Sequence, residues 1–149
     1  MRSEIEILAL HALFLAGKHT INVFPLPAEC QDSAQANLMS DGHYEARIVF
    51  CAPVIDETTY MIQLHEMGHL VAPGGMFKVD ELLPIPIQIT KRMDQEDAAW
   101  AWARETALVW TLEMEVKAQW ARETYRHHLE RTVKRLYIRS NRKNVKDWR

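Results

Sequence analysis

The segment from Lys91 to the C-terminus contains neither glycine nor proline, and this restricts the fold more than any other feature of the sequence. Apolar residues recur in it at helical spacing from Ala99 to Leu136. One helix, or two collinear helices, could therefore run through about 40 residues, which is roughly 60 Å at 1.5 Å per residue. A domain of 149 residues is narrower than that. The helix must consequently kink, break or project.

The residues before this segment predict shorter elements of both kinds. In chain order the patterns favour a helix at 7–16, an edge strand at 20–26, a loop at 28–42, a strand at 43–54, a helix from the cap at Asp56 to the stop at Pro73, and an irregular extended segment at 76–90. We expect an α+β fold in which a small, mostly antiparallel sheet packs on the second helix and a long C-terminal helical segment follows. Ordinary hydrophobic content, at 48%, excludes a disordered or collagen-like chain.

The net charge of −2 averages over two unlike pieces. Residues 1–116 carry 7 Lys and Arg against 17 Asp and Glu, whereas residues 117–149 carry 11 against 3. We therefore divide the chain into a domain at 1–116 and a basic helical extension at 117–149 that packs on it or projects from it. The extension's basic residues spread over several helical faces. This arrangement fits three roles: a solvated surface, contacts with an acidic partner or a neighbouring copy, and contacts with nucleic-acid phosphates. The candidates for contacts with a partner or with nucleic acid are Arg131, Lys134, Arg135 and Arg139.

The cysteines and the N-terminus favour a cytoplasmic protein that does not enter a membrane. Two cysteines, Cys30 and Cys51, do not make a disulfide framework, so we expect free thiols. The apolar run at 7–16 is interrupted by His11 and follows two glutamates instead of a basic leader. It is also shorter than the roughly 20 residues that span a bilayer.

The sequence His65-Glu66-Met67-Gly68-His69 is the strongest functional signal. Histidines at i and i+4 lie one turn apart on the same helix face, so both imidazoles can hold one Zn²⁺ ion while Glu66 acts as general base on a water. A di-iron bundle needs a second Glu-x-x-His, and no other glutamate has histidine three residues later. No third histidine of metzincin type follows the motif either.

A zinc site of this type needs a third protein ligand. The acidic cluster Asp94, Glu96 and Asp97 opens the alanine- and tryptophan-rich helix. Glu96 is preferred, because Ala99 and Ala103 lie on its face and small residues allow two helices to approach closely. Asp97, Asp94 and the two histidines at 127 and 128 stay as alternatives.

The order of these parts resembles the ImmA/IrrE-type zinc peptidases, which are small gluzincin-like enzymes. Five pieces carry the resemblance over residues 5–107: an opening helix, the run INVFPLP at 21–27, the strand RIVF at 47–50, Thr59 before HEMGH, and Glu96 followed by Ala99 and Ala103. The chain departs from the family pattern at Leu64 and at Trp100-Ala101-Trp102. A divergent zincin outside the family, such as one encoded by a phage or a mobile element, therefore remains an alternative. The resemblance implies a minimal zincin-like domain and a cytoplasmic peptidase; several members of the family cleave DNA-bound repressors.

The implied reaction is zinc-assisted hydrolysis of a protein substrate, with Glu66 moving the proton. A hydrogen-bond donor to the tetrahedral intermediate is also needed. Tyr60 is the candidate we name, while Tyr44, His43 and Arg92 remain open. The competing hypothesis is a nucleic-acid-binding or adaptor protein with a structural or degenerate zinc site, and the long helix offers a surface for homo-oligomers.

Overall fold

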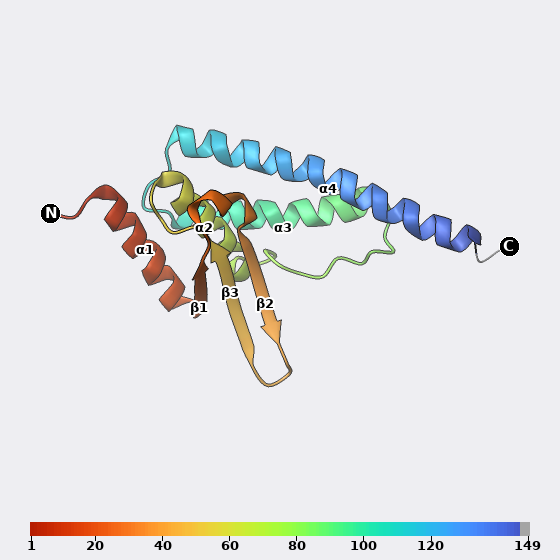
Figure 1. Cartoon of the computed structure of the whole chain (residues 1–149), viewed down its shortest axis with the longest axis horizontal. Coiled ribbons are helices and arrows are strands. Elements are labelled where there is room, and N and C mark those ends of the chain that lie inside the picture. Colours follow the sequence, from red (N-terminus) through yellow and green to blue (C-terminus); the bar gives the residue numbers. More distant parts are fainter. Residues whose placement is uncertain (147–149) are drawn as a thin grey trace.

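The computed structural model describes residues 1–146 and confirms the α+β class. This part of the chain forms α1 (Glu4–Lys18), β1 (Ile21–Pro25), the 3-10 helix η1 (Ala28–Ser33), β2 (Gln35–Ser40), β3 (Glu45–Cys51), α2 (Glu57–Val71), α3 (Ile85–Thr106) and α4 (Leu112–Lys146). Figure 1 shows the long α4 lying above α3, with the sheet below and α1 to one side. The predicted strand at 43–54 and helix from Asp56 are both present.

The sheet has the order β1-β3-β2, with β1 parallel and β2 antiparallel to the central β3. It is therefore mixed and not mostly antiparallel. The strand at 20–26 lies at an edge, as predicted. The expected loop at 28–42 was wrong, since it contains η1 and β2. The polar residues of β2 give a weak strand pattern, and its pairing with β3 supplies the stability that the local sequence lacks.

Helix α2 is the central element, with contacts to α1, β2, β3, α3 and α4. Its side chains Tyr60, Leu64 and Met67 are fully buried. They join one hydrophobic core that also contains Leu8, Ala12, Leu15, Ala16, Ile21, Val49, Cys51, Met61, Trp100, Ala103, Met114 and Ala118. Because these five elements pack on α2, the first four residues of the HEMGH motif are buried and His69 is half-buried.

The glycine-free segment breaks into two helices instead of running straight. Between Thr106 and Leu112 the chain turns, so that α3 and α4 pack against each other in opposite directions (Figure 1). Glu115 fastens the turn, because its Oε2 accepts from Arg104 Nε at 2.7 Å and from Trp110 Nε1 at 2.6 Å. Of the three ways to fit this segment into the domain, the chain uses a break, and the collinear arrangement was wrong.

Helix α3 also begins earlier than expected. Residues 85–90 are helical instead of extended, with Pro84 at the N-cap and Pro86 in the first turn. Proline is tolerated there because the N–H groups of the first turn have no acceptor within the helix, so the missing N–H of proline breaks no helical hydrogen bond. The acidic residues at 94–97 consequently lie in the third and fourth turns and not in the first.

Helix α4 crosses the expected boundary between residues 116 and 117, and Met114 and Ala118 on its two sides are both buried in the main core. Residues 147–149 of the basic extension lie outside the described residues. Cys30 and Cys51 are free thiols, as predicted. None of the helices described here combines the length and apolar character that a membrane crossing requires.

Candidate metal centre

Helix α2, which carries the two histidines, has its start fixed by a capping box. Asp56 Oδ1 accepts from the backbone N–H of Thr59 at 2.7 Å, and Thr59 Oγ1 accepts from that of Asp56 at 3.1 Å. From this start, His65 and His69 fall on consecutive turns of one face. Both side chains point toward α3, where they meet Glu96.

Glu96 reaches the histidines because α2 and α3 approach very closely. Ala99 and Ala103 are fully buried at this contact. A Cβ placed on Gly68 would lie 2.5 Å from the carbonyl oxygen of Ala99, so only glycine fits there. The small residues on α3 therefore allow the close approach of the two helices, as predicted from the sequence. On α2, Gly68 of the motif is the small residue that contacts them.

The three side chains form a compact group. His65 Nε2 is 2.8 Å from Glu96 Oε1, and His69 Nε2 is 3.1 Å from Glu96 Oε2. One ligand atom from each residue lies within 4.8 Å of the others. Bonds of about 2.0–2.2 Å to a tetrahedral zinc ion separate ligand atoms by roughly 3.3–3.5 Å, so small side-chain rotations suffice. The group is close enough to bind a metal ion.

The second nitrogen of His69 is held by the backbone. Its Nδ1 lies 2.8 Å from the carbonyl oxygen of Gly75, which can only accept, so Nδ1 donates and Nε2 is left free for a metal. Gly75 fits against the end of α2 because a Cβ there would lie 2.6 Å from the Gly68 oxygen. This contact had no signal in the sequence, because the accepting atom belongs to the main chain.

His65 is buried in a polar but incomplete environment. Its ring stacks on Trp100 with centroids 4.0 Å apart, and its Nδ1 lies 3.3 Å from Glu66 Oε1. Its Nε2 is buried and has no hydrogen bond of acceptable geometry, despite the nearby Glu96 oxygen. A metal ion would satisfy this nitrogen. Two histidine nitrogens and one carboxylate also form the donor set typical of catalytic zinc sites.

The charges of the group are strongly coupled. Burial would lower the pKa of His65, but the carboxylates of Glu66 and Glu96 overcome it and raise that pKa to about 9. Burial would raise the pKa of Glu96, but the adjacent imidazoles of His65 and His69 hold that pKa far below its usual range. Glu96 is therefore ionised, as a metal ligand must be.

The other candidate ligands are placed differently. Asp97 accepts two hydrogen bonds from Arg122 of α4, and Asp94 is exposed. The histidines at 127 and 128 are exposed on α4. Among the described residues, the metal-binding group contains Glu96 and none of these four.

Tyr60, the candidate transition-state donor, has another role. Its hydroxyl lies 2.7 Å from His11 Nδ1 and accepts the backbone N–H of Leu108 at 3.0 Å. The side chain is fully buried, and these contacts join α1 to the turn between α3 and α4. The hydroxyl of Tyr60 therefore braces the fold through these two contacts.

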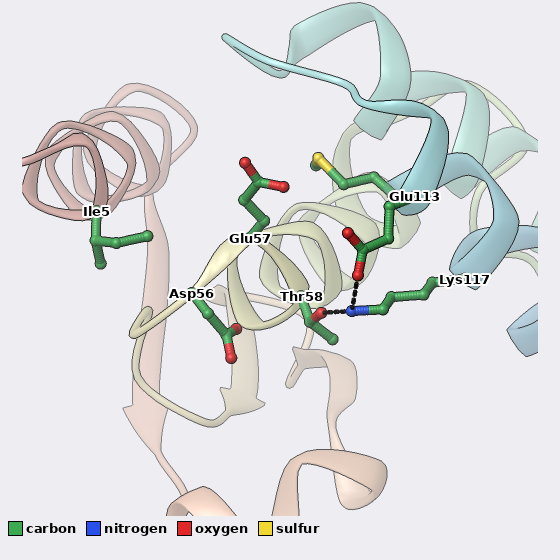
Figure 2. Close-up of a pocket in the computed structure, with 7 residues that line it drawn as sticks. Ile5, Asp56, Glu57, Thr58, Glu113 and Lys117 are labelled. Atoms are coloured by element: carbon green, nitrogen blue, oxygen red, sulfur yellow. Dashed lines mark hydrogen bonds and ion pairs between the residues drawn. The ribbon is translucent and has the colours of Figure 1, made fainter.

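A separate pocket of about 280 Å³ lies where α1 and the N-terminal ends of α2 and α4 meet (Figure 2). Lys117 crosses it, donating to Thr58 Oγ1 at 2.7 Å and lying 3.3 Å from Glu113 Oε1. None of the residues that line it belongs to the metal-binding group. The contact between Lys117 and Thr58 joins α4 to the start of α2.

The four basic candidates of α4 share one exposed face. Arg131, Lys134, Arg135 and Arg139, together with Ile138, line a shallow hollow on this face, while Leu129 and Val133 turn toward α3. This basic face is more concentrated than the sequence suggested. Within the described part of the chain, its four basic side chains form no ion pair.

No protein-family model, no curated protein and no solved structure matches the chain.

Proposed function

We propose that the protein is a zinc-dependent metallopeptidase. One observation carries the proposal: His65 and His69 of α2 converge with Glu96 of α3 in a largely buried group, and Glu66 lies beside His65. Two imidazoles and one carboxylate leave a coordination position for water, as catalytic zinc sites require. A structural zinc site would instead be closed by a fourth protein ligand, and the group in the described residues has three members.

The chain's own residues supply the rest of the chemistry. A zinc ion, when bound, lowers the pKa of a water molecule towards 7 and polarises a carbonyl group. Glu66 accepts the proton of the attacking water and passes it to the leaving amine. The water oxygen adds to the carbonyl carbon, and the carbon–nitrogen bond then breaks. Gly75 and Trp100 keep the two imidazoles in place while the proton moves.

The substrate class follows from the resemblance in sequence to ImmA/IrrE-type peptidases, which supports a protein substrate. The free thiols of Cys30 and Cys51 suit a cytoplasmic location. A DNA-bound regulator is the type of substrate that the family resemblance suggests.

Metal analysis and one substitution test the proposal. Protein purified without chelators should carry about one zinc per chain, and Glu66→Gln should keep that zinc. Glu66→Gln should also lose cleavage of a proteome-derived peptide mixture, read as new termini by mass spectrometry. Glu105→Gln, on the exposed side of α3, is the matched control and should cleave like the wild type. A wild-type protein that takes up no zinc refutes the proposal.

A second candidate function is polyanion binding through the basic face of α4. The observation in its favour is that four basic side chains on one face form no ion pair within the described residues. Binding of a labelled DNA duplex should weaken as salt rises, with a log–log slope of about −0.9 per phosphate contacted. Replacing Arg131, Arg135 and Arg139 by glutamine should remove this dependence. Unchanged binding in that variant excludes the basic face.

A further inference from the structure

Helix α4 lies alongside the part of α3 that carries Glu96, in a fixed register. Arg122 donates to both carboxylate oxygens of Asp97, through Nε at 2.5 Å and through Nη2 at 3.1 Å. Asp97 directly follows Glu96, and Tyr125 comes one turn after Arg122. Because the two helices run in opposite directions, this ion pair sets Tyr125 beside the turn of α3 that precedes Glu96.

Hydrophobic packing agrees with this placement. Tyr125 packs on a cluster formed by Met93 of α3 and by Leu129 and Val133 of α4. Met93 lies three residues before Glu96, on an adjoining part of the helix surface. The phenol ring is therefore fixed by its neighbours, with its hydroxyl left for other partners. In the described residues, this hydroxyl makes no hydrogen bond.

Arg92 lies one helical turn before Glu96, on the same side of α3. Its Nε is buried and has no hydrogen-bond partner, and its guanidinium forms no ion pair within the described residues. A buried N–H donor without a partner is costly unless an acceptor arrives to pair with it. The unpaired Nε–H of Arg92, one turn along α3 from Glu96, thus indicates a place for an incoming oxygen, and the positive charge of the side chain favours a negative one.

The charges around Tyr125 connect these residues to the metal-binding group. Burial raises the pKa of Tyr125, the Glu96 carboxylate raises it further, the Arg92 guanidinium lowers it, and the Glu66 carboxylate again raises it. The phenol therefore keeps its proton and lies within electrostatic reach of Glu96, Arg92 and Glu66. It is a neutral donor at the edge of the proposed site.

We propose that Tyr125 and Arg92 donate hydrogen bonds to the oxyanion that forms on the scissile carbonyl during hydrolysis. The inference rests on the proposed peptidase function and adds α4 to the active site. Neither residue gives up its proton: water adds to the carbonyl carbon, Glu66 moves the proton to the amine, and Tyr125 and Arg92 stabilise the negative oxygen. Donors of this kind contribute about 10²- to 10³-fold each to the rate.

The test uses the full chain loaded with Co²⁺, whose visible absorption reports ligands at the metal. Inorganic phosphate serves as the tetrahedral oxyanion probe. Tyr125→Phe and Arg92→Gln should bind Co²⁺ as tightly as the wild type, but should bind phosphate roughly 10-fold more weakly, which corresponds to a loss of about 1.4 kcal/mol in binding free energy for each donor removed. With peptide substrates both should lower kcat and leave KM nearly unchanged.

A matched control comes from the exposed surface. Arg126→Gln makes the same chemical change as Arg92→Gln on an exposed part of α4, and it should bind phosphate like the wild type. If Tyr125→Phe and Arg92→Gln hold both Co²⁺ and phosphate as tightly as this control, the inference is overturned while the peptidase proposal stands. If the wild type binds no Co²⁺, both fail together.

Discussion

Replacing Gly68 by alanine should push α2 and α3 apart and damage the metal-binding group. The new Cβ would lie 2.5 Å from the carbonyl oxygen of Ala99, whereas real Cβ atoms essentially never come within 3.0 Å of such a neighbour. The obstructing atoms belong to the backbone, so no side chain can rotate away. Helix α3 must move, and it carries Glu96 with it.

The expected size follows from two opposing effects. Overpacking of a tight contact costs about 1–3 kcal/mol. Alanine in a helix interior is favoured over glycine by up to about 1 kcal/mol. With the full offset, the net loss in the free energy of unfolding should be about 0–2 kcal/mol, centred near 1 kcal/mol. Because Glu96 is displaced from His65 and His69, zinc affinity should also fall by roughly 10-fold or more.

Urea unfolding of the metal-free protein and competition titration with a zinc chelator measure the two effects. Gly17→Ala is the matched control, because Gly17 is also helical and exposed, with nothing within 4 Å of the added Cβ. It should be neutral or stabilising by about 0.5 kcal/mol, with unchanged zinc affinity. If Gly68→Ala behaves like Gly17→Ala in both assays, the close approach of α2 and α3 does not position Glu96.

Three further predictions concern the site and its support. Glu96→Gln should lose zinc in metal analysis, whereas Asp97→Asn should keep it and lose less than about 1 kcal/mol of stability, as expected for a partly exposed ion pair; the reverse result would make Asp97 the ligand. Burial lowers the pKa of His65, but the Glu66 and Glu96 carboxylates raise it to about 9. The metal-free protein should thus lose stability as the pH rises from 6.5 towards 9, measured by urea unfolding in EDTA, and equal stability at both ends would contradict this. Tyr60→Phe removes the hydrogen bonds of its hydroxyl with His11 and with the Leu108 backbone N–H, both part-buried, so thermal unfolding should show a loss of about 0.5–1.5 kcal/mol with zinc binding intact; a loss of zinc binding would return Tyr60 to the site.

The metal-binding group was largely predictable because its signals are local. The spacing of His65 and His69 fixes them on one helix face once the helix exists. Glu96 could be chosen over Asp97 because Ala99 and Ala103 mark the side of α3 that packs closely. Both inferences use helical periodicity, which needs no knowledge of distant contacts.

Elements that depend on distant partners were not predictable in the same way. Strand β2 forms because β3 lies beside it, and its own residues carry little strand preference. The turn between α3 and α4 is stabilised by two side chains from outside it. Tyr60 is far away in the sequence, and Glu115 lies in the first turn of α4. Tyr60 looked like a catalytic donor because sequence position cannot tell a buried brace from an active-site hydroxyl.

The sequence by itself determined that two histidines and a glutamate share one helix, that a basic segment follows an acidic body, and that the glycine-free segment could not run straight through the domain. These follow from composition and from the 3.6-residue period of a helix. Only the tertiary structure decided that Glu96 meets both histidines, that Gly75 fixes one imidazole, and that Tyr125 of α4 packs on Met93, three residues before Glu96. Each of these needs two helices, or a helix and a loop, to be packed at a particular distance and register, which no single segment encodes.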